Sequence, residues 1–289
     1  MKLAVSTYSL WRWRQENKKS VEQALDWLAG EGLKAVELSV LGEQPADPIQ
    51  RAKELRKYCD KVGLKIVSYC VGGEYLLPPD EQRRAIEVTK REVDIAAELG
   101  VPSMRHDVTR GPKDDAQMTL SDVLKQIAPA VREITEYGAK RGVKTTLENH
   151  GFYMQTAERV EKLIQAVGHP NYGLTIDMGN FLCLNQDPVD AVKRLAKYVF
   201  MAHTKDFHVK PKSAMPPGGW FATPTEIALR GAIVGHGVID VPAQLKILKD
   251  AGYNGYLSLE FEGMEEPTQA VRLGLEYVKK QLEAIGALG

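Results

Sequence analysis

The chain has 289 residues, of which 44% are hydrophobic and 26% are charged, a composition typical of a globular protein and not of a disordered one. Lysine plus arginine and aspartate plus glutamate number 38 each, so the formal net charge is zero. This balance argues against a protein that binds nucleic acid or an anionic membrane. The length fits either two ordinary domains or one α/β barrel, a fold that commonly takes about 250 residues.

The compartment can be inferred from the cysteines and from the apolar runs. The three cysteines are scattered without a Cys-x-x-Cys pair, which argues against a disulfide scaffold or a zinc ribbon and favours free thiols in a reducing compartment. The N-terminus has no signal-peptide pattern, and no apolar run approaches the ~18 residues of a membrane span. We therefore expect a soluble, cytoplasmic protein without a membrane partner.

One pattern recurs from the N-terminus to the C-terminus. A short apolar run rich in β-branched residues is followed by a polar turn and then by an amphipathic stretch that ends at a glycine. The apolar runs predict strands at residues 3–6, 34–39, 65–70, 102–105, 144–147, 173–176, 198–202 and 255–259. Helix starts are predicted at Ser20, Asp47-Pro48, Ser121, Thr156 and Asp187-Pro188, and helix stops at Gly32, Gly63, Gly100, Gly142 and Gly252.

Eight strand-helix units without a linker predict a single (β/α)₈ TIM barrel that covers residues 1–289. A doubly wound sheet is the alternative, but no Gly-x-Gly-x-x-Gly follows the first strand. The interval before the last strand is much longer than the others, and residues 205–236 in it are rich in proline and glycine. We interpret this segment as a long, lid-like loop over the mouth of the barrel.

The active site of such a barrel lies at the C-terminal ends of its strands. There, four consecutive strands each end in a side chain that can bind a metal: Glu148, Asp177, His203 and Glu260. Any one of them, taken alone, could be a helix cap or a loop residue. Three acids buried side by side without a cation would be costly, so the set predicts a site for a hard or borderline divalent ion.

The same strand ends resemble the xylose-isomerase-like sugar isomerase/epimerase superfamily, which includes tagatose/psicose 3-epimerases and myo-inosose dehydratase and isomerase. The resemblance covers nearly the whole chain, and its most specific segments are Leu147-Glu148-Asn149-His150-Gly151, Ile176-Asp177-Met178-Gly179-Asn180-Phe181, His203-Thr204-Lys205-Asp206, Gly235-His236-Gly237-Val238-Ile239-Asp240 and Ser258-Leu259-Glu260. It implies a metal site made by the four residues named above, with Mn²⁺ as the expected ion and Mg²⁺, Co²⁺ or Zn²⁺ as alternatives. It also implies a homodimer or homotetramer.

In the epimerases of this family the first and last glutamates face the substrate from opposite sides, which makes Glu148 and Glu260 the candidate catalytic residues. Glu262 shares a strand face with Glu260 and is the alternative ligand. At one position the chain departs from the pattern of related enzymes. Related DNA-repair endonucleases IV carry a histidine three residues after the aspartate, where this chain has Asn180, so we expect no nucleic-acid substrate.

Further side chains near the strand ends are candidates for contact with a carbohydrate substrate, although ordinary packing is an alternative for each of them. Lys205 follows the metal-site histidine by two residues, and strand four ends in Arg105 and His106. The full set of candidate substrate-binding residues is Glu37, His106, His150, Asn180, Lys205 and Trp11, the last by stacking on a sugar ring.

Together these residues predict a divalent-metal-dependent sugar isomerase or epimerase that acts on a small-molecule carbohydrate. A carboxylate would remove the proton next to a carbonyl while the metal stabilises the resulting enediolate. The alternative is a lyase or dehydratase that uses the same site on an inosose or a 3-keto sugar. A third interpretation is that the protein is not an enzyme but a sugar-binding barrel with a degenerate site.

Overall fold

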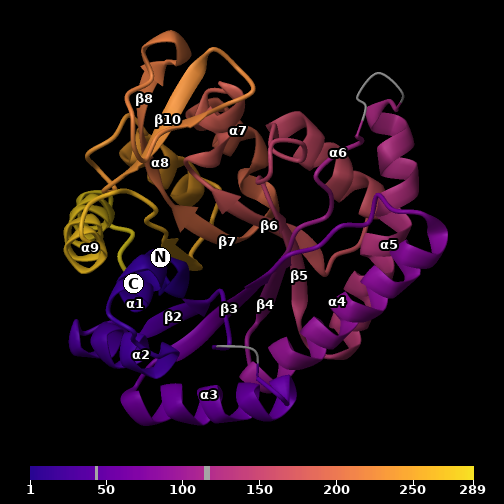
Figure 1. Ribbon diagram of the computed structural model, residues 1–289, viewed down its shortest axis with the longest axis horizontal. Helices are drawn as coiled ribbons and strands as arrows, with labels where there is room; N and C mark the ends of the chain where they lie inside the picture. The colour runs from indigo at the N-terminus through magenta and orange to yellow at the C-terminus, as the bar shows by residue number, and fades with distance from the viewer. Residues whose placement is uncertain (43–44, 114–117) are drawn as a thin grey trace.

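The computed structural model describes residues 1–42, 45–113 and 118–289, and its main feature is a closed barrel of parallel strands (Figure 1). Around the barrel the strands follow the order β1-β11-β7-β6-β5-β4-β3-β2. They are β1 (Lys2–Ser6), β2 (Ala35–Leu38), β3 (Lys65–Val71), β4 (Ser103–His106), β5 (Lys144–Glu148), β6 (Tyr172–Asp177), β7 (Val199–Thr204) and β11 (Tyr256–Leu259). Each strand overlaps one predicted apolar run, so the (β/α)₈ prediction is confirmed.

Helices cover the outside of this barrel. They are α1 (Trp11–Glu16), α2 (Val21–Gly30), α3 (Pro48–Val62), α4 (Pro79–Leu99), α5 (Leu120–Lys140), α6 (Ala157–Val167), α7 (Pro188–Leu195), α8 (Val241–Asp250) and α9 (Pro267–Ala284). The predicted caps Ser20, Asp47, Thr156 and Asp187 each accept a backbone N–H of the first helical turn. The prediction for Ser121 is wrong, because Thr119 caps α5 in a capping box with Asp122.

The core has two parts. Between helices and strands, the apolar faces of the helices contribute fully buried side chains such as Leu25, Leu55 and Val131. Inside the barrel lies a small separate cluster made only of strand residues, namely Ala4, Ala35, Val67 and Met201 with the half-buried Tyr256. Because the interior near the strand starts is filled by these side chains, a ligand can enter only at the C-terminal ends of the strands.

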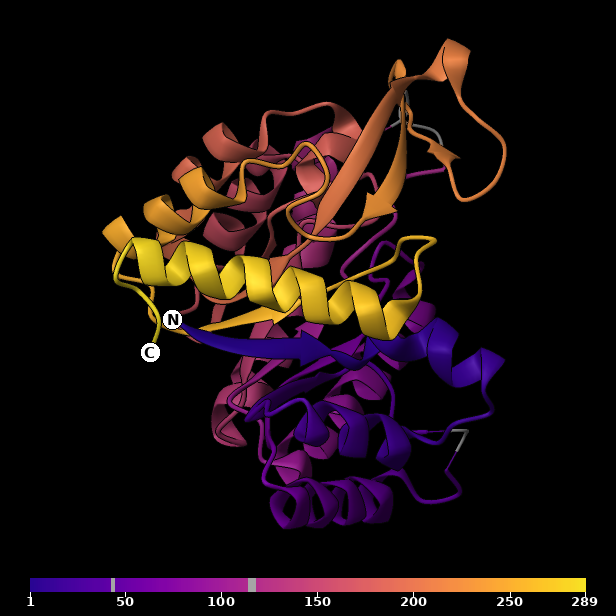
Figure 2. The same cartoon turned by 90° about the vertical axis from the view of Figure 1, so that its left-hand side faces the viewer.

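Residues 205–236 differ from the expected long loop. They contain a three-stranded antiparallel sheet in the order β8-β10-β9, with β8 (Asp206–Pro211), β9 (Phe221–Ala222) and β10 (Ile227–Ala232). Figure 2 shows this sheet projecting beyond the barrel. At its base, Asp206 accepts backbone N–H bonds from Gly235, Gly237 and Ile239 at 2.9–3.0 Å. The start of the sheet is therefore tied to the turn that follows its end.

The two chain ends lie side by side beside the first strand (Figures 1 and 2), where the Gly289 N–H donates to the Met1 carbonyl at 2.9 Å. The cysteines Cys59, Cys70 and Cys183 are free thiols. Among the described residues, none of the helices combines the length and the apolar character needed to cross a membrane.

Candidate active site

Four side chains from the second half of the chain converge at the mouth of the barrel. Glu148 ends β5, Asp177 ends β6, His203 lies near the end of β7, and Glu260 directly follows β11. One ligand atom from each lies within 4.8 Å of the other three. The structure therefore brings together all four residues of the predicted metal site, at one level of the barrel.

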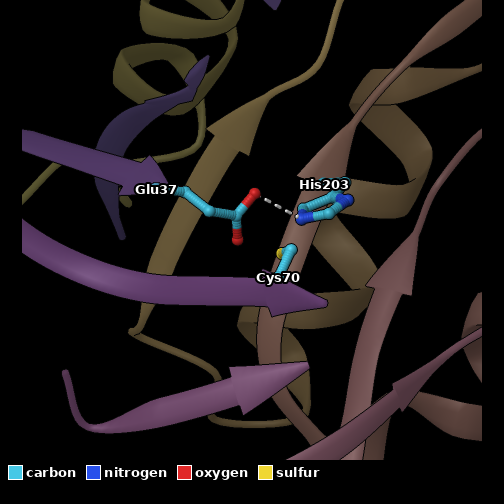
Figure 3. Close-up of side chains that lie close together, drawn as sticks. All are labelled: Glu37, Cys70 and His203. Carbon is cyan, nitrogen blue, oxygen red and sulfur yellow. Dashed lines mark ion pairs between the residues drawn. The ribbon is translucent and has the colours of Figure 1, made fainter. Parts of the chain in front are cut away.

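The imidazole of His203 lies between the carboxylates of Glu148 and Glu260 on one side and the carboxylate of Glu37 on the other. Its Nδ1 atom is 3.4 Å from Glu148 Oε1 and 3.6 Å from Glu260 Oε2. On the other side, Nε2 lies 2.9 Å from Glu37 Oε1 in an ion pair (Figure 3). A carboxylate beside Nε2 favours the tautomer that keeps its proton there, which leaves the Nδ1 lone pair directed at the cluster.

Asp177 is oriented by its own turn. Its Oδ1 atom accepts the backbone N–H groups of Gly179 and Asn180, both at 2.8 Å. Asp177 Oδ2 and His203 Nδ1 are buried and make no hydrogen bond within the described part of the chain. Their contacts are ion pairs, at 3.3 Å to Lys205 Nζ and at 3.4 Å to Glu148 Oε1. Buried ligand atoms that lie 3.8 Å apart without a hydrogen bond are expected where a cation completes their coordination.

The pKa values of the four side chains are also those expected at a site for a divalent ion. Burial raises the pKa of Asp177 to about 6. Burial lowers the pKa of His203, but the carboxylates of Glu37, Glu260 and Glu148 outweigh it and raise that pKa well above its usual value. Without a metal the imidazole therefore carries part of the positive charge that these acids require. Three carboxylates and one imidazole suit Mn²⁺, Mg²⁺, Co²⁺ or Zn²⁺.

A second group of potential ligands consists of Glu37, Cys70 and His203 and meets the same 4.8 Å limit. Figure 3 shows these three side chains, with Glu37 and Cys70 beside the imidazole. Burial raises the pKa of the Cys70 thiol to about 12, and this group offers one carboxylate where the first group offers three. We therefore interpret Glu37 and Cys70 as support for His203 and not as a second metal site.

Lys205 lies beside Glu260. Its Nζ is 2.7 Å from Glu260 Oε2, 3.3 Å from Asp177 Oδ2 and 3.6 Å from Glu262 Oε1. Burial lowers the pKa of this ammonium group, but the surrounding acids outweigh burial and raise it well above its usual value. Burial also opposes the charged form of Glu260, and Lys205 then holds the pKa of Glu260 below its usual value.

Arg105 has the corresponding place beside Glu148. Its guanidinium group lies 2.7 Å from Glu148 Oε2 and 3.0 Å from Asp107 Oδ1, and it donates to the Val71 carbonyl at 3.1 Å. Burial raises the pKa of Glu148, but Arg105 and His203 outweigh it and hold that pKa well below its usual range. The sequence predicts His106 as the substrate contact on this strand, whereas the structure brings Arg105 to the site.

The period-two alternation of strand β4 explains that error. Arg105 faces the mouth, whereas His106 points to the opposite side, where it is fully buried and its Nδ1 lies 3.2 Å from Tyr75 Oη. Trp11, on helix α1, has about half of its surface exposed and is not among the residues that line the cavities at the barrel mouth. The structure therefore does not support His106 as a substrate contact, and the stacking role of Trp11 stays a prediction.

The remaining candidates lie at the site. Asn180 Nδ2 donates to Glu148 Oε1 at 3.2 Å, and His150 Nδ1 lies 3.3 Å from Asp107 Oδ1 at the mouth. Glu37 is fully buried beneath His203, so it is placed to orient that ligand and not to touch a substrate. Above the cluster is a cavity of about 520 Å³, whose lining includes Arg105, Glu148, His150, His203, Lys205 and Glu260.

Two relatives match most of the chain at low sequence identity. The rhizopine catabolism protein MocC of Rhizobium meliloti is 25% identical over 281 residues, which cover 92% of this chain and 83% of the relative. An inosose dehydratase of Lacticaseibacillus casei is 22% identical over 268 residues, covering 86% of this chain and 84% of the relative.

Among solved structures, that of "IOLI protein with a binding zinc atom" has the same fold, with a TM-score of 0.73 at 18% identity and with 97% of this chain and 96% of that chain covered. A family model described as "Xylose isomerase-like TIM barrel" matches residues 25–281. On this match, and with the barrel that the structure shows, the chain belongs to the xylose isomerase-like TIM barrel family.

Proposed function

We propose that this protein is a divalent-metal-dependent enzyme that removes a proton next to the carbonyl of a keto sugar or an inosose. The observation that carries the proposal is the convergence of Glu148, Asp177, His203 and Glu260 beneath a 520 Å³ cavity. The names of relatives support the substrate class, since several are inosose dehydratases and one is an inosose isomerase. Mn²⁺ is the first ion to test, and the zinc in a structural neighbour makes Zn²⁺ the second.

A bound cation at this site would draw electron density from the carbonyl and so stabilise the negative charge that develops on its oxygen. The protein's own groups then move the proton. Glu148 and Glu260 come from different strands, and each offers a carboxylate oxygen within 4 Å of His203 Nδ1. One carboxylate removes the proton and the other returns one, which gives isomerisation or epimerisation.

Elimination is the second candidate reaction, and the unequal neighbours of the two glutamates favour it. Arg105 beside Glu148 cannot release a proton near neutral pH, whereas Lys205 beside Glu260 carries an ammonium proton. In an elimination, a carboxylate takes the proton next to the carbonyl, the adjacent C–O bond breaks, and the departing oxygen takes a proton from Lys205. The products are an unsaturated ketone and water or an alcohol, as a dehydratase or lyase forms.

Product analysis in deuterated water tests the proposal and separates the two outcomes. The Mn²⁺-loaded enzyme is mixed with keto sugars, inososes and 3-keto glycosides, and the products are read by mass spectrometry and NMR. An isomer that has gained solvent deuterium indicates isomerisation or epimerisation, and an ultraviolet-absorbing enone that has lost water or an alcohol indicates elimination. An isomer formed without deuterium uptake, or no turnover of any compound, would contradict the proposal.

A further inference from the structure

A second cavity, of about 330 Å³, adjoins the cavity above the metal cluster. The two share Tyr8, His150, Lys205 and Glu262 as lining residues. Each is of a size that holds part or all of a small ligand. A group attached to a sugar in the first cavity can therefore extend past Lys205 and Glu262 into the second.

The second cavity has two phenylalanine rings in its lining, and the first has none. Phe152 and Phe221 line it with Cys183, alongside the polar side chains of Gln155 and Asn180. Phe152 and Tyr8 each expose about two fifths of their surface, so their rings are accessible to a ligand. Such ring faces suit a flat, apolar ring better than a polyol.

The backbone of Phe152, whose side chain lines the second cavity, is held in an unfavourable conformation. Its φ angle is 66°, in the left-handed region that a phenylalanine rarely adopts. The buried Gln155 fixes the turn, because its Oε1 accepts the Phe152 N–H at 2.6 Å while its Nε2 donates to the Asn180 carbonyl. Strain of this kind persists where the surrounding structure enforces it, and it is concentrated at ligand-binding positions.

The part of the three-stranded sheet that lines the second cavity is also fixed in place. Phe221, on β9, packs edge-on against Phe207 of β8 with ring centroids 6.1 Å apart. Gly231 of β10 lies so close to the chain at Glu262 that an added Cβ would be 2.6 Å from the Glu262 carbonyl carbon. The three-stranded sheet is thus packed directly onto the segment that carries Glu262, and the cavity exists before any ligand binds.

From these contacts, and on the basis of the proposed function, we propose that the substrate is a keto glycoside with an aromatic aglycone. The keto sugar occupies the cavity above the metal cluster, and the aglycone ring lies between Phe152 and Phe221 in the second cavity. A substrate without a ring-sized substituent, such as a free inosose, would leave those aromatic faces uncovered.

Calorimetric binding to the Mn²⁺-loaded protein tests this, with phenyl and methyl 3-keto-β-D-glucopyranoside as the probes. We expect the phenyl compound to bind at least about tenfold more tightly. Phe152→Asn removes the ring but keeps a residue that tolerates the left-handed conformation, and Phe221→Leu removes the other ring. Each variant should lower the preference for the phenyl compound by about threefold or more. Phe200→Leu, at the opposite end of the barrel on β7, should retain it.

Two results would overturn the inference while the proposed function stands. The first is equal affinity of the wild-type protein for the two glycosides, and the second is a preference for phenyl that survives both ring substitutions. Failure of the proposed function looks different, since then neither glycoside, nor any keto sugar or inosose, binds or turns over in the presence of Mn²⁺.

Discussion

The two halves of the barrel contribute to the site in different ways. In the second half, β5, β6, β7 and the segment after β11 supply the four atoms that converge on one point. In the first half, β2, β3 and β4 supply Glu37, Cys70 and Arg105, each of which contacts a residue of that cluster (Figure 3 shows the first two). The second half thus provides the ligands together with Lys205, and the first half adds side chains that orient His203 and hold Glu148 charged.

The difference explains how three buried acids can share one site. Carboxylates of like charge raise one another's pKa unless cations lie nearby. Arg105 beside Glu148 and Lys205 beside Glu260 each hold one glutamate in its charged form. Asp177 has the weakest compensation, and its pKa is raised to about 6. Asp177 is therefore the residue whose charge depends most on a bound metal.

The largest effect is expected from a substitution in the half that supplies the ligands. Asp177→Asn keeps an oxygen for the N–H groups of Gly179 and Asn180 but removes the negative charge. We expect loss of bound metal, measured by elemental analysis, and a fall in kcat of at least about 10³-fold, since the charge stabilisation of the transition state depends on that metal.

The paired variants Glu260→Gln and Glu262→Gln serve as the matched control. Only Glu260 belongs to the four-residue cluster, whereas Glu262 contacts Lys205 at 3.6 Å. Glu260→Gln should therefore lose metal and Glu262→Gln should retain it. The opposite pattern would assign the fourth ligand to Glu262.

A smaller effect is expected from the supporting half. Glu37→Gln removes the charge beside His203 Nε2 while it preserves the size of the side chain. Carboxylates that orient a histidine ligand typically contribute 10–100-fold to metal affinity, so we expect a loss of roughly that size in Mn²⁺ binding by calorimetry. The unfolding midpoint of the metal-free protein should fall as well, because Glu37 and the charged imidazole of His203 form a buried ion pair when no metal is bound. Glu92→Gln, which removes a carboxylate beside Tyr69, is the control, and equal affinities in the two variants would refute the role of Glu37.

The barrel and the four converging side chains could be predicted from sequence for the same reason. In a buried parallel strand the apolar run is nearly continuous, so the first polar residue after it marks the C-terminal end. Glu148, Asp177, His203 and Glu260 all stand at such positions. The spacing of eight runs then places those ends on one rim.

The rest could not be predicted because it depends on facing directions and on pairing between distant segments. Strand β4 has only four residues, too few for a visible alternation, so Arg105 and His106 were equally plausible. The sheet in residues 205–236 forms because β8 pairs with β10 across a segment with several prolines and glycines. That segment resembles a loop when only local propensity is considered.

A last effect, on stability and not on the site, tests the outward face of β4, opposite Arg105. Burial lowers the pKa of His106 to about 4, below the 6.5 of an exposed histidine. Between pH 6.5 and 4 the unfolded chain therefore binds a proton at His106 that the folded chain does not. Lowering the pH through that window should reduce the free energy of unfolding by about 1 kcal/mol per pH unit. His106→Gln should reduce this slope in urea titrations, whereas His208→Gln on β8 should leave it intact. An unchanged slope in the His106 variant would mean that acid destabilisation arises from other groups, such as the paired carboxylates of the site.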